Sequence, residues 1–296
     1  MTGARERIAT GPQGPVAASA AWRTTRFAID LATPRVMGIV NVTPDSFSDG
    51  GRHGGAAGAI AHCERLLKEG ADILDVGGES SRPGAEPVPL ADELARVRPV
   101  LRAAVTLGVP VSIDSYKPEV MRAALDLGVD IVNDIKALRE PGALDLVAVH
   151  AACGVCLMHM RGMEPKTMQA GEPEYADVVR EVGEFLRERA GALCARGVAA
   201  GRIVLDPGVG FGKRDRHNIE LLARMDELRA LGLPLLAGWS RKGTLGKITG
   251  RPVGERTVAS VAAALAAVQR GARIVRVHDV AETVDALKVW RAAALC

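Results

Sequence analysis

Residues 36–51 read VMGIVNVTPDSFSDGG, which joins a short apolar run to a polar loop. The run at residues 36–40 is typical of a buried strand. An open, doubly wound α/β sheet that binds nucleotides usually continues from its first strand into a GxGxxG turn, but the loop here reads NVTPDSFSDGG. This loop holds more polar residues than a connection needs, so it is either a long turn or part of a site.

Seven more short apolar runs follow, and the segments between them repeat apolar residues every three or four positions, as amphipathic helices do. Strands that are apolar on both faces and alternate with helices predict a parallel sheet covered by helices. Eight such units close a (β/α)8 TIM barrel, which we favour over the alternative of an open sheet. The predicted strands are residues 36–40, 73–76, 109–113, 131–132, 155–158, 203–205, 235–237 and 274–277.

The chain of 296 residues fits a single barrel domain, which we place at residues 26–296. Residues 1–25 are rich in Gly, Pro, Thr and Ala, and their Gly and Pro interrupt any signal-peptide core. We therefore expect a short disordered tail. No uncharged apolar run approaches the roughly 18 residues of a membrane span, so no membrane partner is expected.

Charge and cysteine content exclude several classes of protein. A net charge of +3, from 38 basic and 35 acidic residues, does not indicate a nucleic-acid-binding protein. Five scattered cysteines do not form a disulfide framework, so a reducing, cytoplasmic location is expected. Cys153 and Cys156 have CxxC spacing without the partners that complete a zinc site, which favours ordinary buried thiols.

The carboxyl end of every predicted strand is polar. These ends carry the catalytic groups of TIM barrels, although Asp and Asn are also ordinary helix caps and turn formers. Caps alone would have no reason to combine amide and carboxylate acceptors with several cations in one mouth. The strand-end residues are Asn41, Glu79, Arg82, Asp114, Asn133, Asp134, His159, Asp206, Ser240, Lys242, Arg276 and His278.

This mixture predicts a small-molecule ligand with two chemically different ends. The acceptors suited to a heterocycle with N–H groups are Asp114, Asn133 and Asp206. The residues suited to a diphosphate are Arg82 and Arg276, which supply bidentate donors, and His278, which can share its proton with a leaving oxygen. Asn41 adds a neutral oxygen for a Mg²⁺ ion held mostly by phosphate and water.

Two loops at the barrel mouth need separate interpretation. GVGFGK at residues 208–213 is rich in Gly but lacks the spacing and the Ser or Thr of a phosphate-binding Walker loop. It is either a flexible barrel loop or a ligand-lining one through Phe211. Lys242 follows the seventh strand in WSRKG (239–243), a position that favours a site residue over a solvated lysine.

Eight motifs follow one another along the chain: MGIVNVTPDSFSDGG (37–51), GADILDVGGESSRPGA (70–85), SIDSYKPEV (112–120), DIVNDI (130–135), CLMHMRG (156–162), IVLDPGVGFGK (203–213), WSRKG (239–243) and RVHDV (276–280). In this order they resemble the motifs of the dihydropteroate synthase family. They cover the chain after the tail, and eight motifs in register make the resemblance specific.

The resemblance implies a transferase of folate biosynthesis that condenses (7,8-dihydropterin-6-yl)methyl diphosphate with 4-aminobenzoate to give 7,8-dihydropteroate and diphosphate. By the family pattern, the pterin is held by Asp114, Asn133, Met158, Asp206, Lys242 and Arg276. The diphosphate is held by Asn41, Arg82, Arg276 and His278, with Asn41 as a ligand of the Mg²⁺ cofactor. The 4-aminobenzoate side is formed by Ser81, Pro83, Phe211 and Ser240.

The resemblance also implies a dissociative reaction, in which diphosphate leaves before the aromatic amine attacks a cationic methylene carbon. Cationic side chains then act as catalytic residues by neutralising the leaving group, and these are Arg82, Lys242, Arg276 and His278. Because a reactive cation must be shielded from water, we expect a lid at residues 46–51, in which Phe47 covers the aminobenzoate and Asp49 orders the closed form.

The sequence differs from the family pattern at three positions. Ser81 stands where Thr is common, Gly243 where Ser is usual, and Val209 where Phe is frequent. None of these differences removes a charge or a pterin contact. They bear on the shape of the aminobenzoate pocket, and hence on affinity for the sulfonamide analogues that target this family.

Two other functions stay open at this point. A pterin-binding methyltransferase domain shares the acceptor set but would not need the diphosphate cations, and a non-catalytic pterin-binding paralogue would lose loop residues. The family is usually homodimeric through its later helices. The Ala-rich segment 258–268 suits such an interface, although burial against the barrel explains it equally well.

Overall fold

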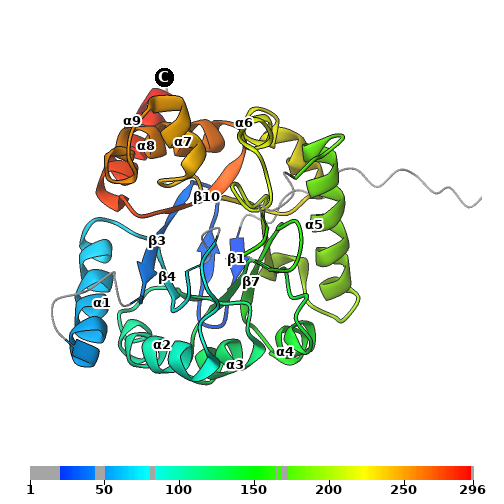
Figure 1. Ribbon diagram of the computed structural model, residues 1–296. Coiled ribbons are helices and arrows are strands. Elements are labelled where there is room, and N and C mark those ends of the chain that lie inside the picture. The colour runs from blue at the N-terminus through cyan, green and yellow to red at the C-terminus, as the bar shows by residue number, and fades with distance from the viewer. Residues whose placement is uncertain (1–20, 44–50, 81–83, 165, 169–172, 295–296) are drawn as a thin grey trace, which may run out of the picture.

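The computed structural model describes residues 21–43, 51–80, 84–164, 166–168 and 173–294. Eight parallel strands form a closed barrel in the order β10-β3-β4-β5-β6-β7-β8-β9, with helices around it (Figure 1). The predicted TIM barrel is therefore confirmed, and an open sheet is excluded. The strands are β3 (Arg35–Asn41), β4 (Ile73–Gly77), β5 (Val111–Asp114), β6 (Ile131–Asp134), β7 (Gly154–Met158), β8 (Ile203–Asp206), β9 (Leu235–Ala237) and β10 (Ala272–Val277).

The helices lie between and after these strands. They are α1 (Gly51–Lys68), α2 (Leu90–Ala104), α3 (Pro118–Asp126), α4 (Ala143–Val149), α5 (Val178–Cys194), α6 (Asp215–Ala223), α7 (Gly243–Thr249), α8 (Thr257–Gln269) and α9 (Val280–Ala294), with short 3₁₀ helices η2 (Ala200–Arg202), η3 (Met225–Leu231) and η4 (Val253–Glu255). No helix in the described part of the chain is long and apolar enough to cross a membrane.

The predicted strands match the observed ones closely, with two informative differences. β5 begins two residues later than predicted, at Val111, because Pro110 has no backbone N–H to donate to a neighbouring strand. β6 continues beyond its apolar pair to include Asn133 and Asp134. Polar side chains at a strand end thus belong to the rigid sheet and not to the loop that follows.

The core has two layers because successive strand residues point to opposite faces of the sheet. Outward-facing residues pack against the helices, whereas inward-facing residues fill the barrel, so its interior is packed and not a pore. Ligand access is left to the ends of the barrel. The inward-facing strand residues of this inner cluster are Met37, Ile73, Ile131, Cys156, Val204, Leu236 and Ile274.

A two-stranded antiparallel hairpin, β1 (Ala21–Arg23) and β2 (Ala28–Asp30), covers the amino-terminal end of the barrel. Trp22 is fully buried there, and its indole Nε1 donates a hydrogen bond of 2.8 Å to the carbonyl of Arg202. Residues 21–25, which the sequence placed in the tail, therefore belong to the folded domain. Strands of three residues are too short to show a period, which is why the pattern missed them. Residues 1–20 lie outside the described part.

Candidate active site

The opposite end of the barrel, where the strands reach their carboxyl ends, holds a cavity of about 1120 Å³. Ten of the residues predicted from the sequence line this cavity. They are Asn41, Asp114, Asn133, Met158, Asp206, Phe211, Ser240, Lys242, Arg276 and His278. The other five predicted residues, Phe47, Asp49, Ser81, Arg82 and Pro83, lie outside the described residues.

Arg276, on β10, reaches across the barrel mouth to two carboxylates. Its Nε donates to Asp75 Oδ2 and its Nη2 to Asp114 Oδ2, each at 2.6 Å. Nη1 has no hydrogen-bond partner among the described residues. The planar guanidinium is therefore fixed by two anions, with one edge left for a ligand.

Asp75 is a residue that the sequence analysis missed. It lies inside β4, is fully buried, and also accepts a hydrogen bond of 3.1 Å from Asn133 Nδ2. Its Oδ1 has no partner among the described residues. The available signal was an acid inside the apolar run ILDVG, since a buried charge needs a partner.

The paired charges shift the pKa values of this group. Burial raises the pKa of Asp114 to about 7, although the positive charge of Arg276 acts in the opposite direction. Burial alone would lower the pKa of Arg276, but the charges of Asp75 and Asp114 outweigh it and raise that pKa. Asp114 therefore changes its charge near neutral pH, whereas Arg276 stays cationic.

Asp206, at the end of β8, is 7% exposed and accepts a hydrogen bond of 2.7 Å from the Gly208 backbone N–H. Burial raises its pKa, and the Gly208 N–H and the charge of Lys242 oppose this shift. The Nζ of Lys242 lies 4.2 Å from the centroid of the Phe211 ring, within reach of a cation–π interaction. A carboxylate, an ammonium and an aromatic ring thus line one part of the cavity.

The loop at residues 208–213 is held in place by Lys213, which is 3% exposed. Its Nζ donates to the carbonyls of Gly208 (2.8 Å) and Phe211 (3.1 Å) and lies 2.8 Å from His159 Nδ1. Burial lowers the pKa of Lys213 well below its usual value, and burial also lowers that of His159. The loop is a well-anchored segment that lines the cavity, and His159 contacts this loop instead of facing the cavity.

Close packing requires glycine at position 208. Its φ is +66°, and a Cβ there would lie 1.9 Å from the carbonyl oxygen of His159. Asp134 behaves as a turn former, since its two oxygens accept the backbone N–H groups of Lys136 and Leu138 at 2.7 Å. The structural interpretation of a polar strand end is therefore correct for Asp134.

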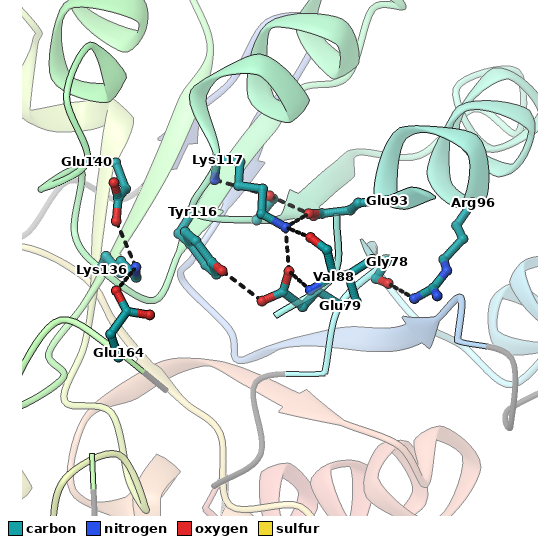
Figure 2. Close-up of polar contacts among 11 residues, drawn as sticks. Gly78, Glu79, Val88, Glu93, Arg96, Tyr116, Lys117, Lys136, Glu140 and Glu164 are labelled. Atoms are coloured by element: carbon teal, nitrogen blue, oxygen red, sulfur yellow. Dashed lines mark hydrogen bonds and ion pairs between the residues drawn. The ribbon is translucent and has the colours of Figure 1, made fainter. Parts of the chain in front are cut away.

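A buried network anchors both described ends of the segment between β4 and α2 (Figure 2). Lys117 Nζ donates to Glu79 Oε2 and Glu93 Oε2, each at 2.5 Å, and to the Val88 carbonyl at 2.6 Å. Tyr116 donates its hydroxyl to Glu79 Oε1 at 2.8 Å. Glu79 and Val88 lie on either side of positions 81–83 in the sequence, so one lysine links the described parts of the segment before and after them.

The chemistry of the metal site can be judged from its donors. No group of three or more His, Cys, Asp or Glu in the described residues is arranged to hold a metal. Asn41, at the end of β3, places a neutral side chain at the cavity wall. This arrangement suits a Mg²⁺ ion that takes most of its ligands from phosphate and water.

Residues 37–278 match the family described as "Pterin binding enzyme". The dihydropteroate synthase of Neisseria meningitidis serogroup B is 55% identical over 92% of this chain and 96% of that protein. The Xanthomonas albilineans dihydropteroate synthase solved with 4-aminobenzoic acid is 50% identical with a TM-score of 0.87, covering 93% of this chain and 99% of that one. The Burkholderia cenocepacia enzyme complexed with 7,8-dihydropteroate is 52% identical with a TM-score of 0.84, covering 93% and 97%. This chain therefore belongs to the dihydropteroate synthase family.

Proposed function

We infer that this chain is a transferase that condenses (7,8-dihydropterin-6-yl)methyl diphosphate with 4-aminobenzoate to form 7,8-dihydropteroate and diphosphate. The observation that carries the inference is one cavity in which acceptors on β5, β6 and β8, those on β6 and β8 being buried, face cations on β10 and after β9. Family membership and relatives solved with 4-aminobenzoic acid and with 7,8-dihydropteroate support it.

The pterin occupies the acceptor side of the cavity. Asp206 accepts hydrogen bonds at the edge of the ring, and Asn133, whose Nδ2 donates to Asp75, offers its Oδ1 as an acceptor. Asp114 accepts from a ring N–H in its ionised form. Met158 forms an apolar wall beside Asp206 on the neighbouring strand. Lys242 and Arg276 complete the pocket, with Arg276 oriented by its two carboxylates.

The diphosphate lies toward Arg276 and His278, with Arg82 as a further cation. Asn41 contributes one ligand to Mg²⁺, which when bound supplies positive charge that offsets charge on the leaving diphosphate. Phe211 and Ser240 border the 4-aminobenzoate side, with Ser81 and Pro83 as its further contacts.

The protein promotes departure of the leaving group. The bond between the methylene carbon and diphosphate breaks first, and diphosphate takes the electron pair while the Arg276 guanidinium offsets its charge and His278 donates a hydrogen bond to it. The pterin stabilises the methylene cation. The neutral aromatic amine then forms the C–N bond and loses a proton, so no strong general base is required.

The first prediction concerns diphosphate release. We expect the purified chain to release diphosphate only when both substrates and Mg²⁺ are present, and chelation with EDTA to stop the release. Asp206→Ala should lower kcat/KM for the pterin substrate by roughly tenfold or more, because a positioning contact is lost. A coupled diphosphate assay measures both. No release by the wild-type chain with Mg²⁺ would instead identify a non-catalytic paralogue.

A second prediction follows from the pKa of Asp114, which burial raises to about 7. The carboxylate fraction rises from about one tenth at pH 6 to about nine tenths at pH 8, since one pH unit on either side of a pKa changes the ratio tenfold. If the ionised form accepts from the pterin, kcat/KM for the pterin substrate should rise about tenfold over this range. Asp114→Asn should flatten that rise, and an unchanged profile in this variant would assign the titration to another group.

We propose that the protein forms a homodimer through α7, η4 and α8. Ile248, Val253 and Val258 on these elements are 62%, 52% and 83% exposed, whereas the alanines Ala263 and Ala264 face the core. Apolar side chains that are this exposed favour an association surface on these elements. Sedimentation should give a dimer mass, and Val258→Glu should shift the population to monomer.

The four described cysteines are free thiols, which supports a cytoplasmic location.

A further inference from the structure

Ser240 makes two contacts with one residue, His278, at the mouth of the cavity. Ser240 follows β9 and His278 follows β10, and these strands are parallel neighbours in the barrel. The Ser240 hydroxyl oxygen lies 3.1 Å from the backbone nitrogen of His278 and 2.9 Å from its Nδ1. Ser240 is 7% exposed, so water has little access to this hydroxyl.

The hydrogen atoms in this pair can be assigned by counting donors and acceptors. The backbone N–H of His278 can only donate, so the Ser240 oxygen accepts that bond. If Nδ1 also carried a hydrogen, the oxygen would accept twice, and the hydroxyl hydrogen would need a third partner. No other side-chain partner of Ser240 exists among the described residues. If the hydroxyl donates to Nδ1, every hydrogen in the pair is used.

This count selects one tautomer of the neutral imidazole. A buried hydroxyl without an acceptor is unfavourable enough to shift an equilibrium by roughly tenfold or more. Because Nδ1 accepts from Ser240, the ring hydrogen lies on Nε2, the nitrogen farther from the backbone. An Nε2–H group is a donor to an anionic oxygen, whereas the other tautomer would present a lone pair to it.

We propose that Ser240 is a positioning residue that holds His278 as the Nε2–H tautomer, so that the ring donates to an oxygen of the departing diphosphate. This inference rests on the proposed function, which places His278 on the diphosphate. It also gives the Ser240 hydroxyl a use other than a hydrogen bond to the carboxylate of 4-aminobenzoate, since its one hydrogen is already committed to Nδ1.

Ring ¹⁵N NMR of histidine-labelled protein tests the assignment without turnover. At pH 8 an ordinary imidazole is neutral, and the His278 signals are identified by their loss in His278→Gln. The wild-type chain should show a hydrogen on Nε2 and a bare Nδ1. Ser240→Ala should raise the population of the Nδ1–H form, and Ser240→Thr, which keeps the hydroxyl, should restore the wild-type pattern. A hydrogen on Nδ1 in the wild-type chain would overturn the proposal.

Steady-state kinetics distinguish two roles for Ser240: positioning His278, or only lining the aminobenzoate pocket. Ser240→Ala should lower kcat/KM for the pterin diphosphate about tenfold and leave the KM for 4-aminobenzoate nearly unchanged, with recovery in Ser240→Thr. A rise only in the 4-aminobenzoate KM, with an unchanged tautomer, would overturn the proposal. Absence of wild-type turnover together with an Nε2–H signal would refute the proposed function and leave the tautomer assignment standing.

Discussion

Arg276→Met is expected to lower kcat by roughly 10²–10³, the range seen when one preorganised donor to a developing charge is removed. Arg276 offers Nη1 to the ligand while Nε and Nη2 hold Asp75 and Asp114. Its loss also removes the positive charge that opposes the raised pKa of Asp114. At pH 8 Asp114 would then carry a proton more often, so the pterin pocket would lose an acceptor as the diphosphate site loses a cation.

Two variants separate these contributions. Arg276→Lys keeps the charge but loses the planar fork that spans two carboxylates, so we expect an intermediate loss of kcat. Asp75→Asn leaves Arg276 in place and removes the negative charge of one of its two partners, at a residue that does not line the cavity. A loss near tenfold is expected there. Retention of kcat within threefold in Arg276→Met, with normal circular dichroism, would remove Arg276 from the mechanism.

The sequence revealed most of the cavity because of how a parallel barrel is built. The carboxyl ends of all eight strands meet at one face, so polar residues that close apolar runs must converge. All ten ligand-contact residues that the family pattern names within the described ranges line one cavity, whereas the strand-end residues Asp134 and His159 do not. That convergence needs only the strand boundaries, which short apolar runs between helices define well.

The same reasoning fails where partners come from across the barrel. Asp75 lies inside a strand, and its role in the site depends on its hydrogen bond with Arg276. Because Arg276 comes 201 positions later, no local sequence pattern connects the two residues. Lys213 lies in a Gly-rich loop that does not match a phosphate-binding motif, and its contacts are with carbonyls of its own loop and with His159, which follows another strand. The clamp of Lys117 on two glutamates likewise depends on how the segment between β4 and α2 folds back.

That clamp consists of one lysine between two acids with little exposure to water. The side chains of Lys117, Glu79 and Glu93 are 16%, 9% and 1% exposed. Burial opposes the charge on Lys117, but hydrogen bonds to Glu79 and Glu93 outweigh it and raise its pKa. The Ser115 hydroxyl donates a hydrogen bond of 2.8 Å to Glu93 Oε1. The second oxygen of Glu93 and one oxygen of Glu79 accept from Lys117, so both acids lose a hydrogen bond and a counter-charge if the lysine is removed.

Lys117→Met should therefore lower the free energy of unfolding by about 3–5 kcal/mol, because it leaves buried carboxylates without their cation. Urea denaturation measures this loss as a lower midpoint. Lys288→Met is the matched control, since its pair with Asp285 is 70% and 76% exposed and should contribute less than about 1 kcal/mol. Adding Glu93→Gln to Lys117→Met should recover part of the loss, because one uncompensated charge is removed. An equally small effect in both single lysine variants would mean that the acids are solvated, and the network would then not fix the segment that leads to positions 81–83.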